Sequence, residues 1–156
     1  INNITSLLGL LQHPDQMALF KSDPNVTDSA VEEFLRYDGP TNALVRNVAK
    51  EHTLHGRTLK KGQRVFLMMN SANRDPAVFD APNRFDITRS PNRHLTFGQG
   101  VHTCLGLQLA REEGRIAVRR FIERYPDVTF AGPDSFDYID AMVPRGLKRF
   151  DVRLRP

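Results

Sequence analysis

Apolar residues at helical spacing predict three short helices near the start of the chain. Positions 4, 7, 8 and 11 are apolar, and His13-Pro14 ends this first helix because the residue before a proline avoids helical backbone angles. Pro14 opens a second helix, which Asp23-Pro24 ends. Thr27 and Asp28 are candidate caps of a third helix. The N-terminal quarter is therefore expected to be helical.

The pattern changes to short strands and then to an irregular stretch. Strands are predicted over residues 44–48, 53–57 and 65–69. Residues 71–96 show little periodicity, and so long an irregular segment in a compact domain is usually functional. A long helix over about residues 105–125 and a hairpin over about 137–154 complete the prediction. We interpret the chain as one unit or part of one.

The composition is that of an ordinary globular domain. Of the 156 residues, 40% are hydrophobic and 26% are charged, and no apolar run approaches the roughly 18 residues that a bilayer span needs. The net charge of +4 would suit an acidic partner. Nucleic-acid binding is not supported, because the basic residues form no recognisable DNA-recognition helix and no aromatic residues that could stack on bases lie among them. Ile1 is not followed by a signal-peptide pattern, and we interpret the start as a segment entered within a helix.

Cys104 is the only cysteine, which excludes an internal disulfide and favours a reducing, cytoplasmic compartment. It lies just before the long helix, in the segment Phe97-Gly98-Gln99-Gly100-Val101-His102-Thr103-Cys104-Leu105-Gly106. A thiolate there is stabilised by the positive end of the helix dipole and suits a metal. From the residues alone, a buried structural thiol is the leading alternative, and a nucleophile pair with His102 is a weaker one. Structural zinc is disfavoured because it needs four ligands.

The segment around Cys104 resembles the haem-binding loop of the cytochrome P450 family. Phe97-Gly98, Gly100, His102, Cys104 and Gly106 match that loop residue by residue. The resemblance implies that Cys104 is the axial ligand of the iron of haem b, and that a thiolate ligand favours O–O cleavage. It further implies that Phe97 packs near the sulfur, that Gly98 and Gly106 belong to the haem-binding loop, and that His102 pairs with a haem propionate.

Two further elements match the same family. Glu33 and Arg36 are three residues apart on the third helix and, taken alone, would be a solvated ion pair. Glu33-Phe34-Leu35-Arg36 nevertheless resembles the Glu-x-x-Arg element of the family, and Pro82-Asn83-Arg84-Phe85 resembles the later element whose arginine joins it. The resemblance implies a buried network of Glu33, Arg36 and Arg84 that supports the cysteine loop.

The resemblance also assigns residues around the haem and the substrate. It implies that Arg46 binds a haem propionate through its guanidinium fork, with help from His94. The remaining matches are to segments that line the substrate pocket in relatives: Asn42, Ala43, Leu44, Val45, Met142 and Val143. Packing in the core would explain the apolar residues among them equally well.

What the resemblance implies for the whole protein is a bacterial-type monooxygenase, mainly α with a small β part. Such an enzyme inserts one oxygen atom from O2 into a small organic substrate, using electrons from a ferredoxin or flavoprotein. Residues 1–156 would be its C-terminal part, and the proton-relay residues would lie upstream, so none is assigned. The alternative is a non-catalytic fragment that packs as a structural domain and binds haem weakly or not at all. Four arginines are either a docking surface for the redox partner or a solvated helix face: Arg93, Arg111, Arg115 and Arg119.

Overall fold

Helices form the body of the molecule, and small sheets lie beside it and beyond one end. The computed structural model describes residues 2–155. In chain order the elements are α1 (Asn2–Gln12), α2 (Pro14–Ser22), η1 (Pro24–Val26), α3 (Thr27–Tyr37), β1 (Ala43–Asn47), β2 (His52–Leu54), β3 (Arg57–Leu59), β4 (Arg64–Met68), α4 (Met69–Ala72), η2 (Gly100–His102), α5 (Leu107–Arg124), β5 (Thr129–Phe130), β6 (Phe136–Tyr138), β7 (Leu147–Phe150) and β8 (Val152–Arg153). The predicted mainly α fold with a small β part is confirmed. None of these helices has the length and apolar character that a membrane crossing requires.

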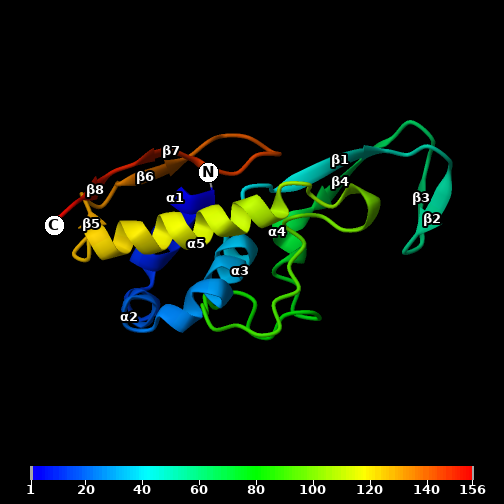
Figure 1. The fold of residues 1–156 in the computed structure, drawn as a ribbon. Helices are drawn as coiled ribbons and strands as arrows, with labels where there is room; N and C mark the ends of the chain where they lie inside the picture. Colours follow the sequence, from blue (N-terminus) through cyan, green and yellow to red (C-terminus); the bar gives the residue numbers. More distant parts are fainter. Residues whose placement is uncertain (1, 156) are drawn as a thin grey trace.

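The core lies where α1, α3 and α5 pack against one another (Figure 1). Leu10, Phe34 and Ile122 contribute buried side chains from these helices. At Gly114 a Cβ would lie 3.2 Å from a methyl carbon of Val31, so the glycine allows α5 to approach α3 closely. The long helix that leads away from Cys104 is therefore fixed directly against the third helix.

The strands of residues 2–155 pair into four antiparallel sheets of two strands each: β1–β4, β2–β3, β5–β8 and β6–β7. The sheet β1–β4 extends beyond the start of α5 and leads to the hairpin β2–β3 (Figure 1). The single strand predicted over 53–57 is wrong, because the chain turns back at His55 and Gly56. Both residues have positive φ, 46° and 74°, which is the geometry of a tight hairpin turn.

The predicted caps of the third helix are also wrong. The N-cap of α3 is Val26, which makes no side-chain hydrogen bond, because α3 continues from the turn η1. Capping falls instead to Asp23, whose side chain accepts the Asn25 N–H at 2.8 Å. Thr27 is already helical, and its hydroxyl donates to the Pro24 carbonyl at 2.7 Å.

The irregular segment after α4 is tightly anchored. Phe85 and Ile87 are buried in the core. Asn73 fastens the two ends of the segment together, since its Oδ1 accepts the Leu95 N–H at 2.7 Å and its Nδ2 donates to Thr96 Oγ1 at 2.9 Å. This segment therefore delivers the chain to the cysteine loop in a fixed position.

Candidate haem-thiolate site

Cys104 is held on an exposed loop between η2 and α5. Its backbone N–H donates to the Phe97 carbonyl at 2.8 Å, which closes the loop. Gly98 and Gly100 have φ values of 70° and 79°, a left-handed conformation that glycine adopts without strain. The thiol is free and exposed. Within residues 2–155 the thiol is therefore not a buried structural one.

The apolar residues beside Cys104 are also exposed. Val101 and Leu105 are 98% and 102% exposed, as much as in an extended peptide. Neighbouring apolar side chains displayed around a thiol form a surface on which an apolar group can pack. No cluster of three or more His, Cys, Asp or Glu residues suitable for a metal occurs in the described part of the chain. The donor arrangement present is a single thiol on an apolar surface, and it fits the one axial ligand that haem-thiolate proteins supply.

Two of the residues predicted to bind haem propionates are available to do so. His102 is exposed on η2, and Arg46 is exposed on β1. The Arg46 Nη1 donates to the neighbouring Val45 carbonyl at 2.9 Å. The start of β1 and the cysteine loop both lie toward the same end of α5 in Figure 1.

The structure does not support a propionate role for His94, because both of its ring nitrogens already have partners. The ring is buried. Nε2 lies 3.1 Å from a carboxylate oxygen of Glu32, and Nδ1 lies 3.3 Å from the Thr96 N–H. His94 therefore belongs to the support of the loop.

The two segments predicted to line the substrate pocket are neighbours. The Asn42 N–H donates to the Val143 carbonyl at 2.8 Å, and Thr41 forms an isolated bridge with Pro144. Val45 and Met142 are exposed, and Leu44 is partly buried. Ala43 is fully buried, so its predicted place in the pocket lining is not supported.

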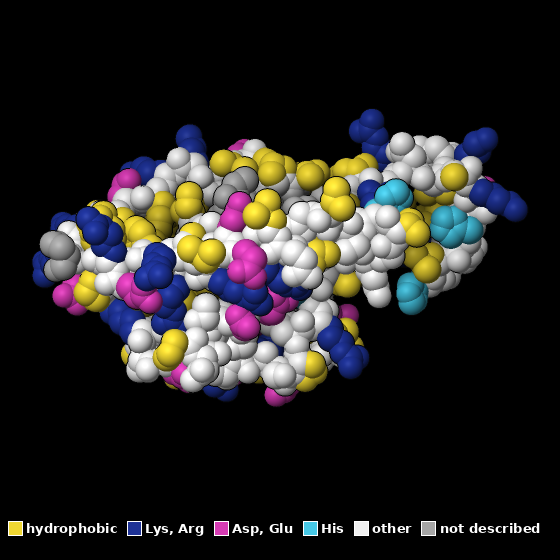
Figure 2. All heavy atoms as spheres, viewed as in Figure 1, with side chains coloured by type: hydrophobic (Ala, Val, Ile, Leu, Met, Phe, Trp, Pro, Cys, Tyr) yellow, Lys and Arg dark blue, Asp and Glu magenta, His cyan; other side chains and the backbone are white. Residues whose placement is uncertain are grey.

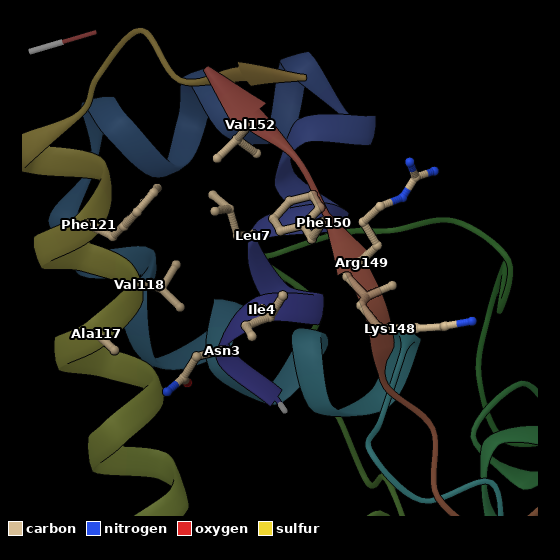
Figure 3. A pocket seen from close by; sticks show the side chains of 11 residues that line it. Asn3, Ile4, Leu7, Ala117, Val118, Phe121, Lys148, Arg149, Phe150 and Val152 are labelled. Atoms are coloured by element: carbon tan, nitrogen blue, oxygen red, sulfur yellow. The ribbon is translucent and has the colours of Figure 1, made fainter. Parts of the chain in front are cut away.

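A cavity of about 420 Å³ between α1, α5 and β7 lies elsewhere (Figure 3). Leu7, Val118, Phe121 and Phe150 point into it. Its part of α5 is roughly 15 Å along the helix from Leu107, at 1.5 Å per residue. This cavity is separate from the Cys104 loop, and the sequence contained no signal for it.

Glu33 and Arg36 form a buried, fully hydrogen-bonded pair. Arg36 Nε and Nη2 donate to the two Glu33 oxygens at 2.7 and 2.8 Å, and both side chains are completely buried. Arg36 also donates to the carbonyls of Asn73, Pro82 and Arg84 at 2.9, 2.8 and 3.1 Å. The pair therefore ties α3 to the irregular segment, and the expectation from the residues alone, a solvated pair, is wrong.

Arg84 does not join this pair through its side chain. Its guanidinium is 69% exposed and lies 3.9 Å from a carboxylate oxygen of Asp86, whereas the next residue, Phe85, is buried. Arg89 takes the expected place: its Nε lies 3.3 Å from a Glu33 oxygen, and its Nη1 donates to the Asp80 carbonyl at 2.7 Å. Sequence reasoning missed Arg89, since no spacing rule singled it out.

Arg89→Ala is expected to lower the free energy of unfolding by about 1 to 3 kcal/mol, because a buried carboxylate and a carbonyl would lose a charged donor. The matched variant Arg84→Ala should change it by no more than about 0.5 kcal/mol, since that side chain is exposed. Urea denaturation of both variants measures the difference. A larger loss for Arg84→Ala would contradict the assignment.

Most of the arginines predicted to dock a redox partner are occupied within the chain. Arg111 binds Glu32, with Nε–Oε1 and Nη2–Oε2 distances of 2.6 and 2.8 Å. Arg115 lies 2.8 Å from Asp28, and Arg119 donates to the Phe20 carbonyl. Arg93 is exposed. Figure 2 shows basic and acidic side chains interleaved along this face, so it is not a uniformly basic surface.

Glu32 is the acid most strongly affected by these contacts. Burial alone would raise its pKa, but the hydrogen bonds from Arg111 and His94, together with their charges, outweigh burial and hold the pKa at about 2. The same hydrogen bond raises the pKa of Arg111. Both groups are therefore charged at neutral pH.

Comparison with known proteins identifies the family of the chain. The family model of cytochrome P450 matches residues 12–131. The chain therefore belongs to the cytochrome P450 family.

Bacterial members of the family are its relatives. The chain is 45% identical over 126 residues to the biotin biosynthesis cytochrome P450 of Bacillus subtilis, covering 81% of this chain and 32% of that protein. It is 43% identical over 152 residues to the vitamin D(3) 25-hydroxylase of Pseudonocardia autotrophica, covering 96% and 38%. The chain thus spans between about a third and two fifths of the length of these relatives.

Solved structures of the family share the fold. The crystal structure of P450BioI in complex with an acyl carrier protein ligated to hexadec-9Z-enoic acid is 41% identical, with a TM-score of 0.93 over 99% of this chain and 40% of that one. Cytochrome P450 PksS of Bacillus subtilis is 39% identical, with a TM-score of 0.95 over 99% and 41%.

Proposed function

We propose that this chain is the C-terminal, haem-thiolate part of a monooxygenase that inserts one oxygen atom from O2 into a small organic substrate. The observation that carries the proposal is the exposed Cys104 thiol, presented by a loop that its own N–H closes onto Phe97. A relative of the chain is a hydroxylase by name. Electrons would come from a ferredoxin or flavoprotein, and the predicted cytoplasmic location is part of the same proposal.

Each residue of the site has a distinct task in this proposal. Haem b, when bound, would supply the oxygen-activating chemistry, and a thiolate ligand favours O–O cleavage. Cys104 would hold the iron, and Gly98 and Gly106 would belong to the loop around the haem. Arg46 and His102 would hold the propionates, the guanidinium through its planar fork. Phe97 would pack near the sulfur.

The substrate would lie against Asn42, Leu44 and Val45 on one segment and Met142 and Val143 on its neighbour. Their exposed side chains are apolar, which suits an organic substrate with little charge. Relatives are described with a carrier-bound fatty acid and with a vitamin as their substrates or ligands. We therefore assign the substrate no further than a small, largely apolar organic molecule.

A second candidate follows from the length comparison. Because the chain spans between about a third and two fifths of its relatives, it would be a non-catalytic fragment if it packs as a domain without retaining haem. Both candidates share the fold, so only haem binding by this chain separates them.

The test is the reduced, carbon-monoxide difference spectrum of the chain supplemented with haem. A band characteristic of thiolate-ligated haem is expected, and Cys104→Ala should abolish it. Gln99→Ala, an exposed position in the same loop, should leave it unchanged. A band that persists in Cys104→Ala would refute the ligand assignment, and no band in the unmodified chain would favour the fragment.

A further inference from the structure

The carboxylate of Glu32 contacts residues on both sides of the cysteine loop. Arg111, on the helix that follows Cys104, donates to both Glu32 oxygens at 2.6 and 2.8 Å. His94, on the segment that precedes the loop, lies 3.1 Å from Glu32 Oε2. One acidic side chain on α3 therefore joins the chain entering the loop to the chain leaving it.

The same two partners of Glu32 also contact Phe97. The guanidinium carbon of Arg111 lies 5.0 Å from the centre of the Phe97 ring, and the His94 ring lies 5.8 Å from it. Phe97 in turn accepts the Cys104 N–H through its carbonyl at 2.8 Å. A continuous set of contacts thus runs from Glu32 to the backbone of Cys104.

A neighbouring ion pair joins the same two helices without touching the loop. Asp28 lies four residues before Glu32 on α3, and Arg115 lies four residues after Arg111 on α5; these side chains are 2.8 Å apart. Asp28 is 74% exposed. If Glu32 only fastened α3 to α5, removing either acid would have a similar effect on the loop.

We propose that Glu32 is a positioning residue for Cys104, which fixes the two limbs of the loop through Arg111 and His94. Charge-assisted, bidentate hydrogen bonds of this kind are short and directional, so they set the spacing of the limbs. That spacing brings the Cys104 N–H to the Phe97 carbonyl. The inference deepens the proposed function, and its relevance to haem rests on that function. The role of Glu32 in the geometry of the loop does not depend on haem.

Amide hydrogen exchange of the full 156-residue chain without haem tests the proposal. In Glu32→Gln, which keeps the size and loses the charge, exchange at Cys104 should accelerate by at least roughly tenfold, because two charged hydrogen bonds are weakened. In Asp28→Asn it should change by less than about twofold. The Ile122 amide, within α5 and in the core, reports whether the whole chain has loosened.

Arg111→Lys provides a second, milder variant, because it keeps the positive charge and loses the bidentate fork. It too should accelerate exchange at Cys104 while Ile122 is unchanged. Unchanged exchange at Cys104 in both Glu32→Gln and Arg111→Lys, or an equal acceleration in Asp28→Asn, would overturn the proposal. None of these readouts uses haem, so a chain that fails to bind haem refutes the proposed function and leaves this result standing.

With haem bound, a spectroscopic readout distinguishes positioning from general stability. Glu32→Gln should reduce the proportion of the thiolate-type band in the carbon-monoxide spectrum, whereas Asp28→Asn should not. Equal bands in the two variants would count against a role of Glu32 at the ligand.

Discussion

Glu33→Gln is expected to lower the free energy of unfolding by about 3 to 5 kcal/mol, because it leaves the buried Arg36 guanidinium without its counter-charge. Both side chains are completely buried, and Arg36 cannot turn to solvent. The substitution keeps the size of the side chain, so a cavity contributes little. Urea denaturation followed by circular dichroism measures the loss.

The exposed pair Arg120 and Glu123 provides the matched control. It has the same three-residue spacing, with an N–O distance of 3.2 Å, but its side chains are 80% and 51% exposed. Glu123→Gln should therefore cost less than about 1 kcal/mol. If both substitutions cost equally little, burial would not be what makes the Glu33 pair important.

Phe85→Ala is expected to lower the free energy of unfolding by about 3 to 5 kcal/mol through the cavity it leaves. The Phe85 ring is buried and stacks with Phe34, with 6.0 Å between ring centres. It also contacts His13 and Tyr37 at 4.7 and 5.0 Å between centres. The ring joins the irregular segment to α3 and to the start of α2, so its loss should free the segment that leads to the cysteine loop.

Phe66→Ala is the control for this second substitution, because Phe66 lies on β4 and is 40% exposed. It should cost much less, about 1 kcal/mol or below. Thermal unfolding of both variants gives the comparison. A loss at Phe85 as small as that at Phe66 would show that the Phe85 ring does not anchor the irregular segment.

Local patterns in the sequence predicted the features that depend on local structure. Helical spacing located α1 to α3 and α5, because each helix buries one face. The loop around Cys104 was recognisable because its glycines and its cysteine are adjacent in sequence. The hairpin β2–β3 was missed because His55-Gly56 is not one of the dipeptides that usually signal a turn.

Features that depend on distant parts of the chain were not predictable in this way. From their spacing alone Glu33 and Arg36 looked solvated, and only the family resemblance implied their burial, because the segment that buries them lies some 50 residues further along. His94 was expected to face the haem, whereas its partner Glu32 is 62 residues away in sequence. Arg89 takes the place predicted for Arg84, and its contact with Glu33 joins residues 56 positions apart in sequence, which no local pattern indicates.

The pairing of strands two by two has a consequence for handling the protein. In residues 2–155 every strand is an edge strand, since each sheet has two members. Edge strands present unpaired backbone N–H and C=O groups, and those that also display apolar side chains are templates for joining another chain. Leu67 and Met68 on β4 are such side chains. Self-association of the chain is expected to begin along the β1–β4 sheet. The protein should therefore be handled in dilute solution.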